Sequence, residues 1–279
     1  MCDHDFQVYQ ITDLIRTFYH ALSGQGYQVC ISPDQVVPGC QNILFLHGQQ
    51  VPQSLWLQWK DAPSPIIVSA WTIAQQAQFQ TFQQESRVYQ LLSQAKSIWT
   101  FFAEEQHCLA AAGLAPQLLR LGHDPVLEFP YAPPASSSYD CLIYGLHSRA
   151  PSPLLQQLRA HKITFALADA MTHIHRDEMI RSAKAVVYLS PAQNCWYFSP
   201  HIVQAAIYHQ KPVFVCHGKT PARLAKFVSN PAQLITALKK WSSAPPHIRR
   251  EIGKKQLSLF RKENLGALLQ HSLERVNRV

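Results

Sequence analysis

Residues that could bind a phosphate lie together in the segment NCWYFSPHIVQAAIYHQKPVFVCHG, residues 194–218. Ser199 stands where a helix N-cap is expected, Pro200 takes the first helical position, and His201 lies in the first turn. A helix start leaves unpaired backbone N–H groups and a positive dipole end, which together favour an anion such as phosphate. An ordinary helix cap explains the same residues equally well, so both interpretations stay open.

Four more candidate ligands precede this segment in the chain. In YGLHSRAPSP, Gly145 and Arg149 precede a helix and could receive a phosphate through backbone N–H groups and a guanidinium. Asp169 ends the next apolar, strand-like run, where an acid could accept bonds from ribose hydroxyls or cap the following turn. Arg176 could contact a base or phosphate, or be a solvated arginine, and we expect Asp177 to cap the helix after it.

A histidine is the candidate for proton transfer. His47 follows the apolar run NILFL, and a histidine there could serve as general base toward an acceptor hydroxyl. The alternative is a strand-end histidine hydrogen-bonded to the backbone. The one tight histidine pair is His173 and His175, and the chain has no C-x-x-C or H-E-x-x-H motif, so we expect no metal site.

Composition favours a folded, cytoplasmic protein. Of the 279 residues, 47% are apolar and 15% charged, which predicts a substantial core. Seven cysteines without paired spacing predict buried thiols in a reducing compartment. No secretory signal or membrane-length apolar run is visible in the sequence.

Positive charge is concentrated at the C-terminal end. Residues 211–279 hold 14 Lys and Arg against three Asp and Glu, whereas residues 1–210 hold 11 against 14. One interpretation is a solvated helix face. The other is attraction to an acidic surface, either a phosphorylated partner or the anionic inner face of a membrane, to which the protein would be peripheral. Aromatic and basic residues do not alternate as in single-strand-binding proteins, so nucleic acid is not an expected partner.

The elements that position these residues alternate between helices and short apolar strands, which predicts an α/β fold with parallel sheets covered on both faces. The proline- and serine-rich segment 129–140 is the expected linker, giving domains 1–132 and 133–279, each a doubly wound sheet; one larger sheet is the alternative. We also expect a strand in YQVCIS (27–32) and only helices from residue 220 to the end.

The order of elements resembles a GT-B glycosyltransferase. YDCLIYGLHSRAPSPLLQQLRAHKITFALADA is similar to the first strand, turn, helix and second strand of the donor-binding domain in these enzymes. HRDEMIRSAKAVVYLSP and FSPHIVQAAIYHQKPVFV resemble the helices and strands that follow, and AKSIWTFFAEEQHCLAAAGLAPQLLRL the segment before the linker. The similarity spans roughly residues 66–215 and is nearest to the group related to the spore-maturation protein CgeB.

This resemblance implies two Rossmann-like domains, the N-terminal one reduced because its usual opening strand and glycine-rich turn are missing. It implies transfer of a sugar from a nucleotide-sugar donor to a cell-envelope or other acceptor, with no metal or other cofactor. The residues at the Ser199 helix start and Arg149 would then contact the diphosphate. A catalytically silent GT-B-like binding or scaffold protein is the alternative, because Tyr197 and Ala205 stand where retaining members often carry glutamates.

Overall fold

The computed structural model describes residues 4–32, 35–46, 53–59, 65–69, 87–101, 103–120, 122–128, 138–144, 153–168, 173–189, 200–216, 226–228 and 231–278. Within these residues the chain is a mixed α/β protein with two parallel sheets, as predicted. It divides into two compact units, one of residues 11–124 and 263–279 and the other of residues 1–10 and 125–262. We call them the N-terminal and C-terminal units.

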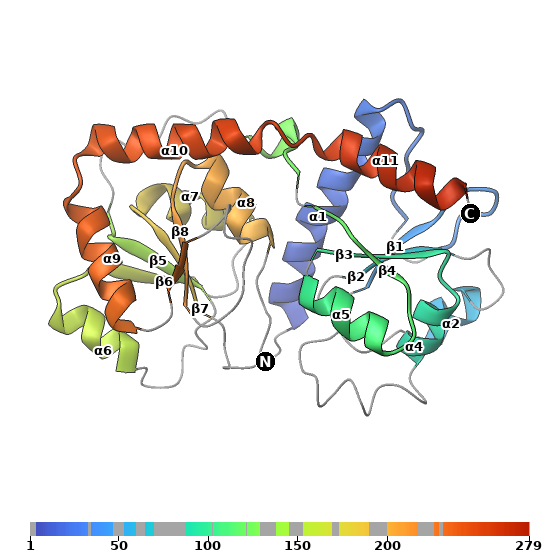
Figure 1. The fold of residues 1–279 in the computed structure, drawn as a ribbon, viewed down its shortest axis with the longest axis horizontal. Coiled ribbons are helices and arrows are strands. Elements are labelled where there is room, and N and C mark those ends of the chain that lie inside the picture. Colours follow the sequence, from blue (N-terminus) through green and yellow to red (C-terminus); the bar gives the residue numbers. More distant parts are fainter. Residues whose placement is uncertain are drawn as a thin grey trace. The chain divides into compact units, whose positions relative to one another are not determined.

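The N-terminal unit contains a four-stranded sheet in the order β1-β2-β3-β4 (Figure 1). Its strands are β1 (Ile43–Leu46), β2 (Ile66–Ser69), β3 (Ser97–Thr100) and β4 (Pro116–Leu118). Its helices are α2 (Gln53–Trp59), α4 (Arg87–Ser93), α5 (Ala103–Ala111), α11 (Leu265–Asn277) and the larger part of α1 (His4–Gly24).

Side chains alternate between the two faces of this sheet because successive residues of a strand point to opposite sides. Phe18 of α1 packs on one face, against Phe45 and Trp99, with ring centroids 5.0 and 6.5 Å away. Ile67 and Ile98 point to the other face and join a buried cluster with residues of α2, α4 and α5. Helices therefore cover both faces, although fewer strands are described here than in the C-terminal unit.

The C-terminal unit contains a five-stranded parallel sheet in the order β6-β5-β7-β8-β9. Its strands are β5 (Cys141–Tyr144), β6 (Phe165–Ala168), β7 (Val186–Leu189), β8 (Val213–Cys216) and β9 (Lys226–Val228). Its helices are α6 (Pro153–Ala160), α7 (His173–Ser182), α8 (Pro200–Tyr208), α9 (Pro231–Ser243) and α10 (Pro246–Phe260), with a short 3-10 helix, η1 (Pro125–Leu127).

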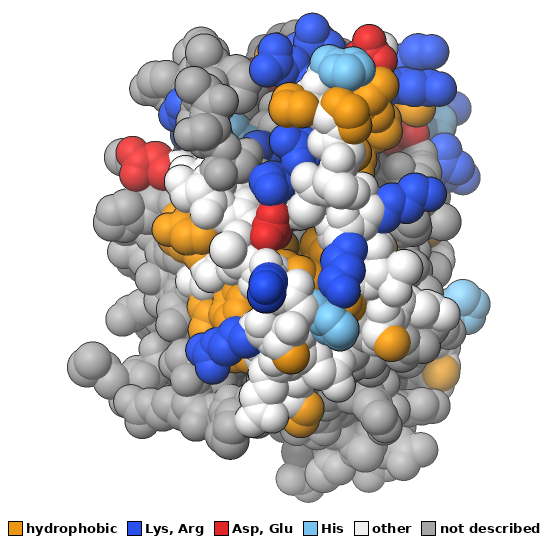
Figure 2. All heavy atoms as spheres, turned by 90° about the vertical axis from the view of Figure 1, so that its left-hand side faces the viewer, with side chains coloured by type: hydrophobic (Ala, Val, Ile, Leu, Met, Phe, Trp, Pro, Cys, Tyr) orange, Lys and Arg blue, Asp and Glu red, His pale blue; other side chains and the backbone are white. Residues whose placement is uncertain are grey.

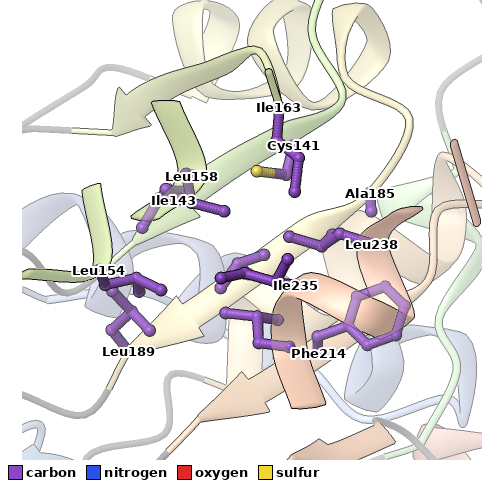
Figure 3. Close-up of a cluster of buried hydrophobic side chains, with 12 residues drawn as sticks. Cys141, Ile143, Leu154, Leu158, Ile163, Ala185, Leu189, Phe214, Ile235 and Leu238 are labelled. Carbon is purple, nitrogen blue, oxygen red and sulfur yellow. The ribbon is translucent and has the colours of Figure 1, made fainter. Parts of the chain in front are cut away.

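The core of this unit follows from its short, continuously apolar strands, which are typical of a sheet buried on both faces. Figure 3 shows the cluster on one face, where Ile143 of β5 and Phe214 of β8 meet Leu158 of α6 and Leu238 of α9. In Figure 1, α7 and α8 lie on the opposite side of the sheet from α6 and α9. Phe260 of α10 packs edge-on against Tyr208 at the end of α8, with ring centroids 6.0 Å apart.

The observed division differs from the predicted domains in two places. The first unit ends at Asp124, before the predicted boundary at 132/133, and the chain returns to it from Glu263 onward. The return is anchored where α11 begins, because a Cβ on Gly266 would lie 2.9 Å from the carbonyl oxygen of Ala21 in α1. This close approach of two helices fixes α11 in the N-terminal unit, whereas the amphipathic pattern of the tail does not identify its partner.

Three sequence-based expectations are corrected. Residues 27–32 form no strand and pair with no sheet in the described structure, and Ile31 is 57% exposed. The region after residue 220 contains strand β9 before its helices begin, and β9 pairs with β8. Among the cysteines that the structure describes, Cys141 is buried but Cys30 and Cys40 are exposed, so the thiols are not uniformly buried.

Candidate functional site

The strand order of the C-terminal sheet creates a preferred ligand edge. β5 pairs with β6 on one side and with β7 on the other, all parallel, so the connections from β5 and β6 leave the sheet in opposite directions. Between such strands a crevice opens outside their carboxyl ends, and ligands of open α/β sheets bind there. By this rule a ligand is expected beyond Tyr144 of β5 and Leu189 of β7.

Most of the predicted ligands follow strands that end at this edge. Tyr144 and Ala168 are paired in register, and the next residues along the chain are Gly145 and Asp169. These two residues, Arg149 and Ser199 lie outside the described residues, as does His47 in the N-terminal unit.

The helix predicted after Ser199 is present. Pro200 is the first residue of α8, as expected from its preset φ angle, and His201 is the second. The helix has nine residues and follows β7, so its first turn, whose N–H groups have no partner within the helix, lies toward the carboxyl edge of the sheet.

Arg176 is largely shielded from solvent, which contradicts the solvated alternative. It lies inside α7, its side chain is 11% exposed, and its Nη2 atom is 3.2 Å from Oδ1 of Asp177. Asp177 is therefore a buried ion-pair partner within the helix and not a cap before it. The buried carboxylate of Asp177 balances the positive charge of the Arg176 guanidinium, so this charge does not need to be solvated by water.

His209 completes this buried cluster. Its Nε2 atom lies 3.4 Å from the same Oδ1 of Asp177, and the side chains of both residues are 6% exposed. Sequence reasoning missed Asp177 and His209 as partners. The available signal was the spacing of Asp177 and Ile180, which places the acid on the inward stripe of α7.

Tyr144 brings the cluster to the ligand edge. This last residue of β5 is 2% exposed, and burial raises the pKa of its phenol, with smaller effects from the charges of Arg176 and Asp177. Within the described part of the chain, its hydroxyl has no hydrogen-bond partner. The end of β5 thus carries a buried hydroxyl that feels the charges of the Arg176–Asp177 pair.

The N-terminal sheet carries a polar cluster at its own carboxyl edge. Ser69 and Thr100, the paired last residues of β2 and β3, donate hydrogen bonds to the two carboxylate oxygens of Glu105 on α5. Glu105 is 6% exposed. His47 directly follows Leu46, the residue of β1 that pairs with Ser69. The sequence analysis overlooked Glu105, although an acid just after a strand end at a helix start was a usable signal.

The described residues contain no group of three or more His, Cys, Asp or Glu side chains placed to hold a metal ion. The side chains of His173 and His175 lie outside that description. No helix in the described ranges is both long and apolar enough to span a bilayer.

Comparisons with known proteins agree on the fold. No protein-family model and no curated protein matches the sequence. Among solved structures, the chain is similar to a mutant of TarM of S. aureus in complex with UDP, with 9% identity and a TM-score of 0.54 over 80% of this chain and 53% of that one. It is also similar to the GtfA/B complex, with 10% identity and a TM-score of 0.50 over 96% of this chain and 61% of that one.

The two units with parallel sheets therefore have the fold of GT-B glycosyltransferases. The chain spans between half and two thirds of the length of these glycosyltransferase structures. The N-terminal domain of Candida albicans trehalose-6-phosphate phosphatase matches as well, with 10% identity and a TM-score of 0.54 over 99% of this chain and 74% of that one. Since a phosphatase domain shares the fold, the activity has to be argued from the site.

Proposed function

We propose that this chain is a glycosyltransferase that moves a sugar from a nucleotide-sugar donor to a cell-envelope or other acceptor, without a metal ion or other cofactor. The observation that carries the proposal is the largely shielded, ion-paired Arg176 of α7, whose charge acts on Tyr144 at the carboxyl end of β5 in a GT-B-like fold. A guanidinium held in place by a buried carboxylate can stabilise the negative charge that develops on a departing diphosphate. Among the groups of GT-B glycosyltransferases, we favour the one related to the spore-maturation protein CgeB.

The proposed roles follow the chemistry of each side chain. Ser199, Pro200 and His201 bind the distal phosphate at the start of α8, while Gly145 lets the backbone approach the diphosphate. Arg149 and Arg176 supply positive charge, and Asp169 accepts bonds from ribose hydroxyls. His47 acts as general base toward the acceptor hydroxyl.

A catalytically silent binding or scaffold protein of the same fold is the second candidate. Neither Tyr197 nor Ala205 is acidic, and Ala205 is buried in α8, so this position offers no carboxylate to a donor. The match to the N-terminal domain of a phosphatase supports it too, since the GT-B-like fold also occurs in a protein named for another activity. We further propose a cytoplasmic location for either candidate.

The test is a thermal-shift screen against UDP, GDP, CMP, ADP and dTDP, followed by an assay for transfer or hydrolysis with the matching nucleotide-sugars. A ligand at 100 times its dissociation constant adds about 2.7 kcal/mol of stability, which is a measurable shift. We expect one nucleotide to raise the melting temperature, with loss of the shift in Arg149→Ala and His201→Ala.

Arg159→Ala is the matched control, because Arg159 is exposed in the last turn of α6, at the opposite edge of the same sheet. This variant should retain the full shift. A shift without any turnover would favour the silent protein, and no shift with any nucleotide would overturn both donor binding and transfer.

A further inference from the structure

Helix α10 carries a second apolar stripe that faces away from the core. Its buried residues, Gly253, Leu257 and Phe260, lie on one side and pack toward the rest of the C-terminal unit. Ile248, Ile252 and Leu259 recur at helical spacing on another side, and they are 38%, 47% and 56% exposed. Isolated exposed aliphatic residues are common on protein surfaces, but three aligned on one helix form a surface.

Positive charge borders this stripe on one side, where Lys255 and Lys262 fall at helical spacing, while Arg250 and Lys254 lie farther round the helix. α10 has four Lys and Arg residues against the single acid Glu251. Arg250, Lys254 and Lys255 are exposed, as is Lys262 just beyond the helix. Arg261 differs, because its guanidinium donates two hydrogen bonds to the carboxylate of Glu128, 2.7 and 2.5 Å long. Figure 2 shows hydrophobic side chains among Lys, Arg and His side chains on the face that includes the start of α10.

We propose that this outward face of α10 binds the surface of an anionic lipid bilayer. The aliphatic stripe enters the headgroup region while the flanking ammonium groups contact lipid phosphates, as in interfacial amphipathic helices. The stripe assigns the membrane contact to one helix, α10, of the basic C-terminal region. The membrane proposal does not depend on the proposed sugar transfer. A second copy of the chain is a poor occupant, because pairing α10 with itself would bring cations of the same sign together.

The test is co-sedimentation of the full chain with vesicles of phosphatidylcholine alone or with about a quarter phosphatidylglycerol. We expect binding only to the anionic vesicles, with loss near 1 M salt, where the Debye length is about 3 Å. The variant Ile248→Ser/Ile252→Ser/Leu259→Ser should lower the partition coefficient by at least about tenfold. Lys255→Gln/Lys262→Gln keeps the stripe and should lower the partition coefficient by about fivefold for each lysine.

The matched control replaces three aliphatic side chains of similar exposure in the N-terminal unit. Ile31, Leu57 and Leu118 are 57%, 50% and 44% exposed, and their triple serine variant should bind vesicles like the wild type. If the α10 triple variant does not fold, the lysine variant carries the test, since its positions are exposed. The proposal is overturned if the wild type shows no preference for anionic vesicles or if the α10 variants bind normally. Self-association that is lost with the stripe, seen by light scattering, would instead make it a protein interface.

Discussion

Asp177 pairs with Arg176 inside α7 of the C-terminal unit. The Nη2 atom of Arg176 lies 3.2 Å from Oδ1 of Asp177, and both side chains are shielded from solvent. His209 approaches the same oxygen from the end of α8, at 3.4 Å. One carboxylate therefore connects α7 to the chain that follows α8 and holds the guanidinium of Arg176.

Removing this carboxylate should be strongly destabilising. Asp177→Ala removes the carboxylate from a largely buried ion pair, and loss of one member of a buried pair costs about 3–5 kcal/mol. Urea unfolding followed by circular dichroism measures the change. Glu128→Ala is the comparison, because it breaks a more exposed pair with Arg261 and should cost about 1 kcal/mol or less. Equal effects of the two substitutions would contradict a structural role for the buried cluster.

Glu105 should stabilise the strand ends of the N-terminal sheet. Glu105→Ala leaves two buried hydroxyls, those of Ser69 and Thr100, without this acceptor, and hydrogen bonds to charged groups contribute about 1.5–3 kcal/mol each. We expect a clear fall in melting temperature, with partial recovery in Glu105→Gln, which retains one oxygen acceptor. If Glu105→Gln restored the full melting temperature, the negative charge of Glu105 would contribute nothing to stability.

Asp140 should make the stability of the C-terminal unit sensitive to acid. Burial raises the pKa of this carboxyl, but hydrogen bonds from Lys184, Thr164 and Ser242 outweigh burial and lower it to about 2. The folded pKa is below the unfolded one, so the stabilisation is complete above about pH 4 and is lost as the pH falls toward 2.

Asp140→Asn should therefore reduce the free energy of unfolding by about 2 kcal/mol at neutral pH and by much less near pH 2. Denaturant titrations at a series of pH values measure the difference between the variant and the wild type. A difference that does not vary with pH would show that the ionised form of Asp140 is not what the fold stabilises.

Gly253 allows α10 to approach the turn between α8 and β8. A Cβ at this position would lie 2.3 Å from the carbonyl oxygen of Gln210, whose own φ is +57°. Gly253→Ala forces backbone atoms apart, at a cost of about 1–3 kcal/mol that exceeds the gain in helix propensity. Gly24→Ala is the control, since no atom lies within 4 Å of its added Cβ, and it should be neutral or stabilising in thermal melts.

The sequence predicted the fold class well because the signals were local. The apolar runs at Ile66–Ser69 and Val186–Leu189, each followed by a helix, are strands of parallel sheets as expected. The start of α8 at Pro200 follows from the fixed φ of proline.

The errors concern partners far apart in the chain. β9 is three residues long and includes Lys226, and its pairing with β8 outweighs a helical pattern. His209 and Asp177 meet only after α7 and α8 pack, 32 residues apart in sequence, and Ser69 likewise meets Glu105 across 36 residues. Short-range periodicity contains no information on such contacts.

The most direct test of the proposed donor site is hydrogen exchange of the full chain with and without a saturating nucleoside diphosphate. The account predicts slower exchange in residues 145–152 and 190–203, which follow β5 and β7, and unchanged exchange in residues 182–185 and 209–212 at the opposite edge of the sheet. Protection confined to the opposite edge, or no protection with any nucleotide, would contradict a donor site at the switch point.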